Sequence, residues 1–486
     1  MNILLASSEV HPFSKTGGLG DMTGSLGKAL ATAGHPVGLV TPLYHGIRAK
    51  VPGLQRLDYR IDLPLGSRWV QAGVWALEWL PGLTVYFVDQ PEFFDRPGIY
   101  NEHEVDYRDN ADRFIFFSKS VAHLARYLPP QPAVVHVHDW QTGLVPLMVV
   151  HQRERDGWGT APRTCLTVHN LAYQGWFGAG AYGLTNLPPD YFHPEGAESF
   201  GGLNCLKAGI AFSDIMTTVS PRYAREILTE AFGCSLDDLL RRRQRDLVGI
   251  LNGADYSEWN TSRNPYLKHP YSTSDLGGKA KEKRDLQTDL GLVPAPDLPL
   301  FGNVSRLVDQ KGSDLLLGAL EEMLAAPMQF ALLGSGSPRL ERAFQRLALR
   351  HPGKVAVRIG YDHALAHRIE AAADFFVMPS RFEPCGLNQM YSLRYGTIPI
   401  VRATGGLDDS VVDLTENAQQ ATGIKFQEPS PSALAKAIRK ALVLYQRKPL
   451  LESLRQNGMA KDFSWDRTAG EYLGVYERII KAAVRG

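Results

Sequence analysis

Short apolar runs alternate with longer helical patterns along almost the whole chain, and this alternation occurs twice. The runs of the first half end near residue 220, and those of the second half begin near residue 298. Such an alternation is typical of parallel sheets built from βα units. The predicted strands lie within residues 2–7, 35–42, 83–89, 133–139, 163–169, 214–220, 298–306, 328–336, 354–360, 374–380 and 398–403. The predicted fold class is therefore α/β, with two doubly wound domains.

The alternation of apolar runs and helical patterns is interrupted between residues 253 and 296. The stretch 254–275 is rich in Asn, Pro and Ser and resembles a connector, and 279–292 has the composition of a charged helix. A chain of 486 residues is too long for one ordinary core. We expect a domain boundary near residue 260 and a closing amphipathic helix at 462–483. Because ligands lie beyond the carboxyl ends of parallel strands, we also expect a deep interdomain cleft.

The charge balance and the cysteines limit the partners of the chain. Lys and Arg number 52 against 51 Asp and Glu, which argues against a nucleic-acid binder or a binder of anionic membranes. The four cysteines are scattered without a CxxC pair, so neither a disulfide framework nor a structural zinc site is indicated. The N-terminus lacks the pattern of a signal peptide, and no apolar run approaches the ~20 residues of a membrane span. We expect a cytoplasmic protein.

The loop KTGGLGD at residues 15–21 follows the first predicted strand. Its glycines let the backbone approach a ligand, and the following helix offers free N–H groups to an anion. A plain tight turn explains the glycines equally well. Such a turn needs neither Lys15, which could neutralise a phosphate, nor Asp21, which could be a first-turn helix acid.

Two further loops of the first half carry polar side chains at strand ends. His138 and Asp139 end one strand, and Asp139 could instead cap the next helix. His169 ends another strand, in a loop of amides and aromatic rings that suits a sugar. No HExxH pattern or carboxylate–His cluster supports a metal site at the histidines of these loops.

Three loops of the second half have comparable signals. Arg306 and Lys311 lie after a strand and could clamp a diphosphate, although a solvated loop would also hold them. Glu383 could accept two sugar hydroxyls or be a first-turn helix acid, and Cys385 is better explained as a small buried thiol than as a nucleophile. A third glycine turn, Thr404–Gly406, gives backbone donors a second approach to phosphate.

Seven motifs in one order resemble the glycogen and starch synthase family. They are KTGGLGD, HDWQTGL, TVHNLAYQG, GILNGADYSEWN, SRLVDQKG, PSRFEPCGL and ATGGLDDSV, and they run nearly from end to end. The resemblance implies a GT-B fold with an N-terminal Rossmann-like domain at 1–258 on the acceptor side. It implies a donor-binding domain at 259–463 and a C-terminal helix, about 464–486, that crosses back onto the first domain.

The resemblance also implies an activity, that of a hexosyltransferase. The reaction is retaining transfer of glucose from ADP-glucose to the non-reducing 4-OH of an α-1,4-glucan such as glycogen. No cofactor and no metal are expected, because protein cations serve the diphosphate.

Individual positions acquire roles from the same resemblance. Lys15, Asp139, His169, Arg306, Lys311 and Glu383 are the expected catalytic residues. The expected donor contacts also include Gly18, Asn252, Tyr361 (against adenine), Cys385, Gly386, Leu387, Thr404, Gly405 and Gly406. The expected acceptor or sugar contacts are Asp21, Tyr100, Asp139 and His169.

Two positions depart from the family pattern, and three other activities stay open. Gln141 replaces a histidine, and Asp408 replaces an alanine near the expected phosphate, where a carboxylate would be unfavourable unless it points away. Tyr391 stands eight residues after Glu383, where many other retaining transferases have a second glutamate; this branch of the family predicts its absence, so Glu383 is expected to act alone. The alternatives are a related transferase that uses UDP-glucose or another acceptor, a nucleotide-sugar epimerase, and an inactive glucan-binding regulator. The sequence leaves the oligomeric state open.

Overall fold

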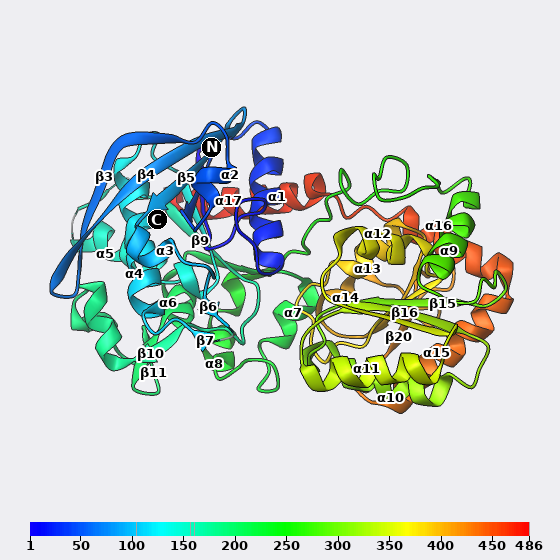
Figure 1. The fold of residues 1–486 in the computed structure, drawn as a ribbon. Coiled ribbons are helices and arrows are strands. Elements are labelled where there is room, and N and C mark those ends of the chain that lie inside the picture. The colour runs from blue at the N-terminus through cyan, green and yellow to red at the C-terminus, as the bar shows by residue number, and fades with distance from the viewer. Residues whose placement is uncertain (104, 156, 160, 486) are drawn as a thin grey trace. The chain divides into compact units, whose positions relative to one another are not determined.

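The computed structural model describes residues 1–103, 105–155, 157–159 and 161–485. Its contacts divide the chain into two compact units, each described here by itself (Figure 1). The first unit comprises Met1–Val219, Ala224–Gly253 and the segment from Trp465 onward, and the second comprises Ser220–Tyr223 and Ala254–Ser464. None of the described helices is both long enough and apolar enough to cross a membrane.

The first unit is built on a nine-stranded sheet in the order β14-β13-β9-β8-β1-β2-β5-β4-β3. The strands from β14 to β5 are parallel, whereas β4 and β3 are antiparallel neighbours at one edge. The bounds are β1 Ile3–Ala6, β2 Val37–Pro42, β3 Gln55–Leu65, β4 Arg68–Leu80, β5 Leu83–Asp89, β8 Val134–His138, β9 Arg163–Val168, β13 Ile215–Thr218 and β14 Leu247–Gly249. The central strands are buried apolar runs, as expected for a parallel sheet covered by helices.

Helices of the first unit form two groups by their contacts. Helix α1 (Gly18–Thr32) contacts β2 and the last helix of the chain, α17 (Trp465–Arg485) (Figure 1). The helix α5 (Val145–Arg155) contacts both α4 (Asn110–Tyr127) and α6 (Cys205–Phe212). Besides short 3-10 helices, the unit has these short α-helices and strands: α2 Ile47–Lys50, α3 Pro91–Phe94, α8 Asp237–Arg242, β6 Asn101–Glu102, β7 Val105–Asp106, β10 Trp176–Gly178, β11 Glu198–Ser199 and β12 Gly202–Asn204. The helix α7 (Pro221–Glu226) includes residues of both units.

The second unit has a six-stranded, fully parallel sheet in the order β17-β16-β15-β18-β19-β20. Numbered from its own first strand, this order is 3-2-1-4-5-6, the strand order of a Rossmann fold. The strand bounds are β15 Leu300–Val304, β16 Gln329–Gly334, β17 Val355–Ile359, β18 Phe375–Met378, β19 Ile398–Arg402 and β20 Ile424–Phe426.

Successive strand residues of the second unit point to two separate cores. Phe301 and Phe330 belong to one buried cluster, whereas Leu300 and Ala331 belong to the other. Helices cover both faces of the sheet (Figure 1). Their bounds are α9 Gly277–Asp289, α10 Ser313–Met323, α11 Pro338–Arg350, α12 His363–Ala372, α13 Asn388–Arg394, α14 Gly405–Ser410, α15 Pro431–Gln446 and α16 Lys448–Met459.

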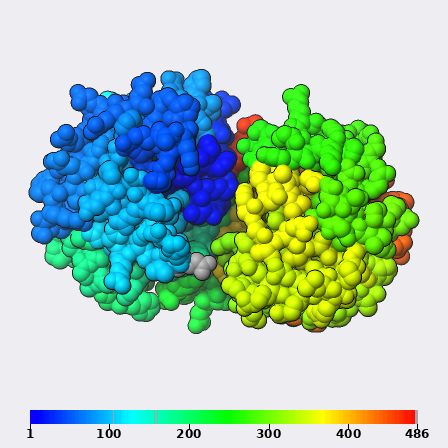
Figure 2. Space-filling model, in the orientation of Figure 1, coloured from blue at the N-terminus to red at the C-terminus, as the bar shows by residue number. Residues whose placement is uncertain are grey.

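The surface of each unit mixes segments that lie far apart in the sequence. On the face shown in Figure 2, early segments of the chain, coloured blue, make up much of the surface of the first unit. On the same face, segments coloured green and yellow make up much of the second unit.

Candidate functional site

Each parallel sheet has a point where the strand order reverses, and the loops around that point hold the polar residues singled out above. In the second unit the reversal lies between β15 and β18, which precede Lys311 and Glu383. In the first unit it lies between β1 and β8, which precede the KTGGLGD loop and Asp139. Open α/β sheets bind ligands at such switch points, because the diverging loops leave a crevice there. Each unit therefore has a candidate site at the carboxyl ends of its strands.

Lys311 and Glu383 are brought into contact in the second unit. The Lys311 Nζ lies 2.5 Å from Glu383 Oε2, and the Ser380 hydroxyl donates a 3.0 Å hydrogen bond to the same oxygen. The Glu383 side chain is 8% exposed. Helix α13 begins only at Asn388, so Glu383 is not a first-turn helix acid. The pair offers a cation for an anionic ligand beside a carboxylate for hydroxyl groups.

Glycines allow the loops around this pair to touch through their backbones. Gly405 has a φ of +44°, and a Cβ there would lie 2.0 Å from the carbonyl oxygen of Glu383. Gly312 has a φ of +66°, and its Cβ would lie 2.1 Å from the Pro379 carbonyl. The Gly406 N–H donates to the Glu383 carbonyl at 3.1 Å, so this expected phosphate donor already has a partner within the unit. Thr404 is the buried residue that precedes α14.

Two other expected donor contacts are exposed. Arg306 follows β15 directly and makes no ion pair with any residue that the structure describes. Tyr361 follows β17 with 83% of its surface exposed, so its ring is accessible to a ligand. Cys385 is buried, and Gly386 and Leu387 continue from it to the start of α13. An accessible cation and an accessible ring thus accompany the Lys311–Glu383 pair.

The departure at Asp408 has a structural explanation. Its carboxylate pairs with Lys425 Nζ at 2.9 Å, and Lys425 also contacts Glu416 at 3.0 Å. The negative charge at Asp408 is therefore compensated by a buried lysine.

Tyr391, at the position where other retaining transferases have a second glutamate, has a packing role. Its ring stacks on Trp259 with centroids 3.8 Å apart.

In the first unit, a glutamate that the sequence analysis missed holds the glycine loop. The Glu9 carboxylate accepts hydrogen bonds from Thr16 N–H at 2.5 Å, Gly17 N–H at 3.2 Å and the Thr16 hydroxyl at 2.7 Å. The Tyr100 hydroxyl donates a further bond at 2.7 Å. Two of the donors to Glu9 are backbone N–H groups, which leave no pattern in the sequence. The only sequence signal for its role was therefore its position shortly after a strand. The buried Glu9 carboxylate thus organises the loop through these hydrogen bonds.

Lys15 and Asp21 pair with each other at the edge of this loop. The Lys15 Nζ lies 2.7 Å from Asp21 Oδ2, with side chains 40% and 28% exposed. Asp21 lies in the first turn of α1, as the sequence indicated. Gly18 is the first residue of that helix, and a Cβ there would meet no atom within 4 Å. The space beside Gly18 is therefore open on the side of its missing side chain.

Asp139 has a positive φ, a backbone conformation that is uncommon for residues other than glycine. Its φ is +56°, and its carboxylate accepts a 2.7 Å hydrogen bond from the His169 N–H. It makes no capping hydrogen bond to the turn that follows, so the capping alternative is wrong. Burial raises the pKa of Asp139 to about 7, although the backbone N–H groups of His169 and Asn170 act in the opposite direction. Asp139 therefore connects the ends of β8 and β9.

A row of histidines lies behind Asp139. His138 Nδ1 is 3.1 Å from His169 Nε2, and His136 contacts the Tyr476 hydroxyl at 2.7 Å and the Thr167 hydroxyl at 2.6 Å. Burial lowers the pKa of His136 and of His169 to about 3, so both rings are neutral at pH 7. A neutral His169 can position a hydroxyl group but carries no charge.

Asn252 and Gln141 are buried polar residues with one unpaired atom each. Asn252 follows β14, and its Oδ1 has no hydrogen-bond partner among the described residues. The same holds for Oε1 of Gln141. Unpaired buried oxygens are rare in proteins and mark places where a further donor can bind.

Family models cover most of the chain. The model described as the starch synthase catalytic domain matches residues 2–242, and the one described as glycosyl transferases group 1 matches residues 292–460. A glycogen synthase of Anaeromyxobacter sp. (strain Fw109-5) is 48% identical over 480 residues, which is 99% of each chain. Glycogen synthase 2 of Nitrosococcus oceani is 44% identical and covers 98% of this chain and 97% of its own.

Solved structures agree with these matches. The catalytic domain of starch synthase IV from Arabidopsis thaliana, solved bound to ADP and acarbose, superposes with a TM-score of 0.87 at 34% identity, covering 99% of both chains. A sucrose-phosphate synthase from Thermosynechococcus elongatus superposes with a TM-score of 0.62 at 18% identity over the same share of both chains, which bears on the fold alone. The predicted α/β class with the GT-B fold is confirmed.

Proposed function

Given that the chain belongs to the glycogen and starch synthase family of glycosyltransferases, we propose that it elongates an α-1,4-glucan with glucose from ADP-glucose. The product would keep the α configuration, and ADP would leave. The second unit would bind the donor, and the first unit would supply Lys15 and the contacts to the acceptor. The relative solved with ADP and acarbose, an adenine nucleotide and an oligosaccharide, supports both substrate classes.

The contact between Lys311 and Glu383 carries the proposal. A cation and a carboxylate side by side at the switch point match a sugar diphosphate, which presents anionic oxygens next to hydroxyl groups. The diphosphate would compete for Lys311 and for the exposed Arg306, and the glucose hydroxyls would take the place of the ammonium group at Glu383. Neither a glucan-binding module nor a regulator needs this combination.

The reaction would proceed by attack on the same face as the leaving group. The acceptor 4-OH forms a bond to the anomeric carbon as the bond from that carbon to the β-phosphate oxygen breaks. The acceptor proton passes to the departing phosphate, so no protein base is required. Lys15, Arg306 and Lys311 would stabilise the negative charge that develops on ADP.

Asp139 is the alternative nucleophile in the first unit. A double displacement needs an ionised carboxylate at the anomeric carbon. A pKa near 7 and the bonds from backbone N–H groups make Asp139 a poor candidate for that role. We therefore assign Asp139 to positioning the His169 loop. Trapping a glucosyl-enzyme at Asp139 would overturn this assignment.

One assay separates the proposed activity from its alternatives. Purified protein is incubated with labelled ADP-glucose or UDP-glucose, each with and without glycogen. Glucan-dependent incorporation from ADP-glucose is expected, and NMR of the product should show new α-1,4 linkages. Preference for UDP-glucose would correct the donor, conversion of the sugar nucleotide without glucan would indicate an epimerase, and binding without turnover would indicate a regulator.

A further inference from the structure

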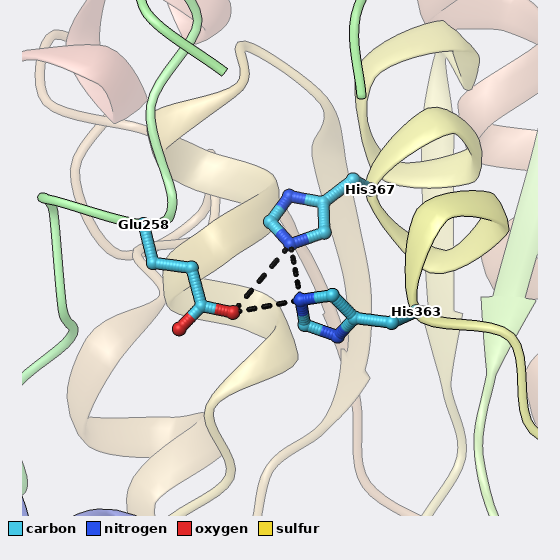
Figure 3. Close-up of side chains that lie close together, drawn as sticks. All are labelled: Glu258, His363 and His367. Atoms are coloured by element: carbon cyan, nitrogen blue, oxygen red, sulfur yellow. Dashed lines mark hydrogen bonds and ion pairs between the residues drawn. The ribbon is translucent and has the colours of Figure 1, made fainter. Parts of the chain in front are cut away.

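Three side chains that the activity does not use converge in the second unit (Figure 3). Glu258 comes from the segment after β14, and His363 and His367 come from the first two turns of α12. The spacing of four residues places both imidazoles on one face of the helix. No metal was expected from the sequence, because the family resemblance implies that protein cations serve the diphosphate. The possible metal site considered in the loops lay at histidines of the first half, and Glu258 lies more than a hundred residues from α12.

The distances between the three ligand atoms suit one small cation. Nε2 of His363 and Nε2 of His367 are 3.2 Å apart, and Oε1 of Glu258 lies 2.8 Å from the first nitrogen and 3.8 Å from the second. Ligands at 2.0–2.1 Å from a tetrahedral Zn²⁺ are about 3.3 Å from one another. The mean separation in the empty cluster is close to this value, so shifts of about half an ångström would complete the geometry.

Neighbouring groups already orient His367 for this role. Its ring is buried and stacks on Trp259 with centroids 3.8 Å apart and planes 15° from parallel. Its Nδ1 lies 2.9 Å from both the Tyr395 hydroxyl and the side-chain amide nitrogen of Asn264. In the tautomer in which the hydroxyl accepts the Nδ1–H, the Nε2 lone pair is left for a metal. Histidine ligands of zinc are usually held by such an outer hydrogen bond.

An ordinary hydrogen bond between Glu258 and His363 would explain one of the three contacts. It leaves the contact at 3.2 Å between the Nε2 atoms of His363 and His367 unexplained, because a neutral imidazole nitrogen carries either a proton or a lone pair. Nε2 of His363 therefore cannot donate to Glu258 and accept from His367 at the same time. A cation satisfies all three atoms at once. Glu258 and His363 are both partly exposed, so an ion can enter from solvent and a water molecule can occupy the fourth position.

We propose that Glu258, His363 and His367 form a binding site for a divalent transition-metal ion of the Zn²⁺ type. Two imidazoles and one carboxylate are the ligand types that this ion takes in proteins. The ion would tie the segment after β14 to the start of α12. Tyr361 lies two residues before His363, with its hydroxyl 3.4 Å from His363 Nδ1, so the ion would also fix the loop that carries this exposed ring.

The test uses the full-length protein after chelation and dialysis. Zn²⁺ is titrated by calorimetry, Co²⁺ is added to record the visible absorption of a tetrahedral site, and thermal unfolding is followed with and without Zn²⁺. We expect one tight site per chain and a higher Tm with the metal, because the ion binds only the folded state.

Two variants decide whether the three residues hold the ion. His363→Ala should weaken the site more than about 100-fold, since even outer-shell losses weaken metal sites 10–100-fold. The matched control is His269→Ala, because His269 pairs with Asp285 at 3.2 Å in the same unit without a third ligand. The control should bind like the original chain. Absence of tight binding by the original chain, or an unchanged affinity in folded His363→Ala, would overturn the proposal.

Discussion

Replacing Glu9 by alanine tests whether the glycine loop of the first unit must be preformed for turnover. The carboxylate is the acceptor for the N–H groups of Thr16 and Gly17, which stand directly after Lys15. Without it, both backbone donors lose a charged acceptor and the loop can take up other conformations. The nucleotide contacts of the second unit are unaffected by this change.

The size of the effect follows from those two bonds. A hydrogen bond to a charged group stabilises by about 1.5–3 kcal/mol, so two bonds at the lower value give about 3 kcal/mol. If this free energy must be recovered before transfer, kcat falls about 100-fold, since about 1.4 kcal/mol corresponds to a factor of ten. Glu9→Gln retains the shape. Its carbonyl can accept both N–H groups while its amide donates to the hydroxyls of Thr16 and Tyr100. The loss of charge alone should lower kcat about tenfold, because charged hydrogen bonds are roughly twice as strong as neutral ones.

The assay measures kcat with ADP-glucose and glycogen for the original chain and both variants. ADP affinity by calorimetry serves as the control and should change less than about twofold, because the second unit is expected to hold the nucleotide. Circular dichroism and Tm establish that each variant is folded. A kcat for Glu9→Ala within about threefold of the original value, or equal losses in both variants, would refute the reasoning.

Other perturbations address the charges, the glycine contacts and the buried histidines. Lys311→Ala should lower both kcat and ADP affinity, whereas Lys15→Ala should lower kcat about 100-fold or more with ADP affinity almost unchanged, and near-normal turnover of either variant would contradict its role. Gly405→Ala should lower Tm and kcat, because its Cβ would lie 2.0 Å from the Glu383 carbonyl, and a normal Tm would show that the loops can move apart. Acid should unfold the first unit steeply below pH 6.5. Burial lowers the pKa values of His136, His138 and His169 in the folded state, so these three histidines bind protons in the unfolded chain but stay neutral in the folded one. The raised pKa of the Asp139 carboxyl opposes them, and the lowered pKa values of His35 and His123 add to them, so stability should rise with pH between about pH 4 and 6.5. Tryptophan fluorescence against pH measures this, and a flat profile would contradict it.

Much of the fold was predictable because the strands of parallel sheets are nearly continuous apolar runs. The predicted run at 83–89 is the strand β5 to the residue, and the charged helix expected at 279–292 is α9. The long antiparallel pair β3 and β4 was not predicted. The signal was present, since only Gly66 and Ser67 separate the two strands and Gly66 has a φ of +63°. Residues 57–65 of β3 show the alternation of an edge strand, whereas in β4 apolar residues on the outer face, such as Trp69 and Trp75, obscure it.

The site was predictable only as far as position along the chain determines it. Strand ends place Lys311 and Glu383 on loops, but their contact joins residues from either side of a strand reversal, and strand order cannot be read from local periodicity. The role of Glu9 depends on backbone donors, which any residue type provides. The carboxylate of Asp408 was expected to be unfavourable near a phosphate because its partner, Lys425, lies in β20, and the sequence does not show that the two residues meet.

The groups at the two switch points differ in charge, and this difference indicates which part of the transition state each can stabilise. In the second unit the paired groups keep their charges accessible to an anionic ligand, since Lys311 is partly exposed and Arg306 is exposed. In the first unit His169 is neutral and Asp139 is only about half ionised near pH 7, because burial lowers the pKa of His169 and raises that of Asp139. A positively charged sugar ring in the transition state would gain little from such groups, whereas a departing diphosphate would gain much from Lys311 and Arg306. We infer that the barrier is lowered mainly on the leaving-group side. A more acidic leaving group should then make turnover less sensitive to Lys311→Ala, and an equal sensitivity for all leaving groups would contradict this inference.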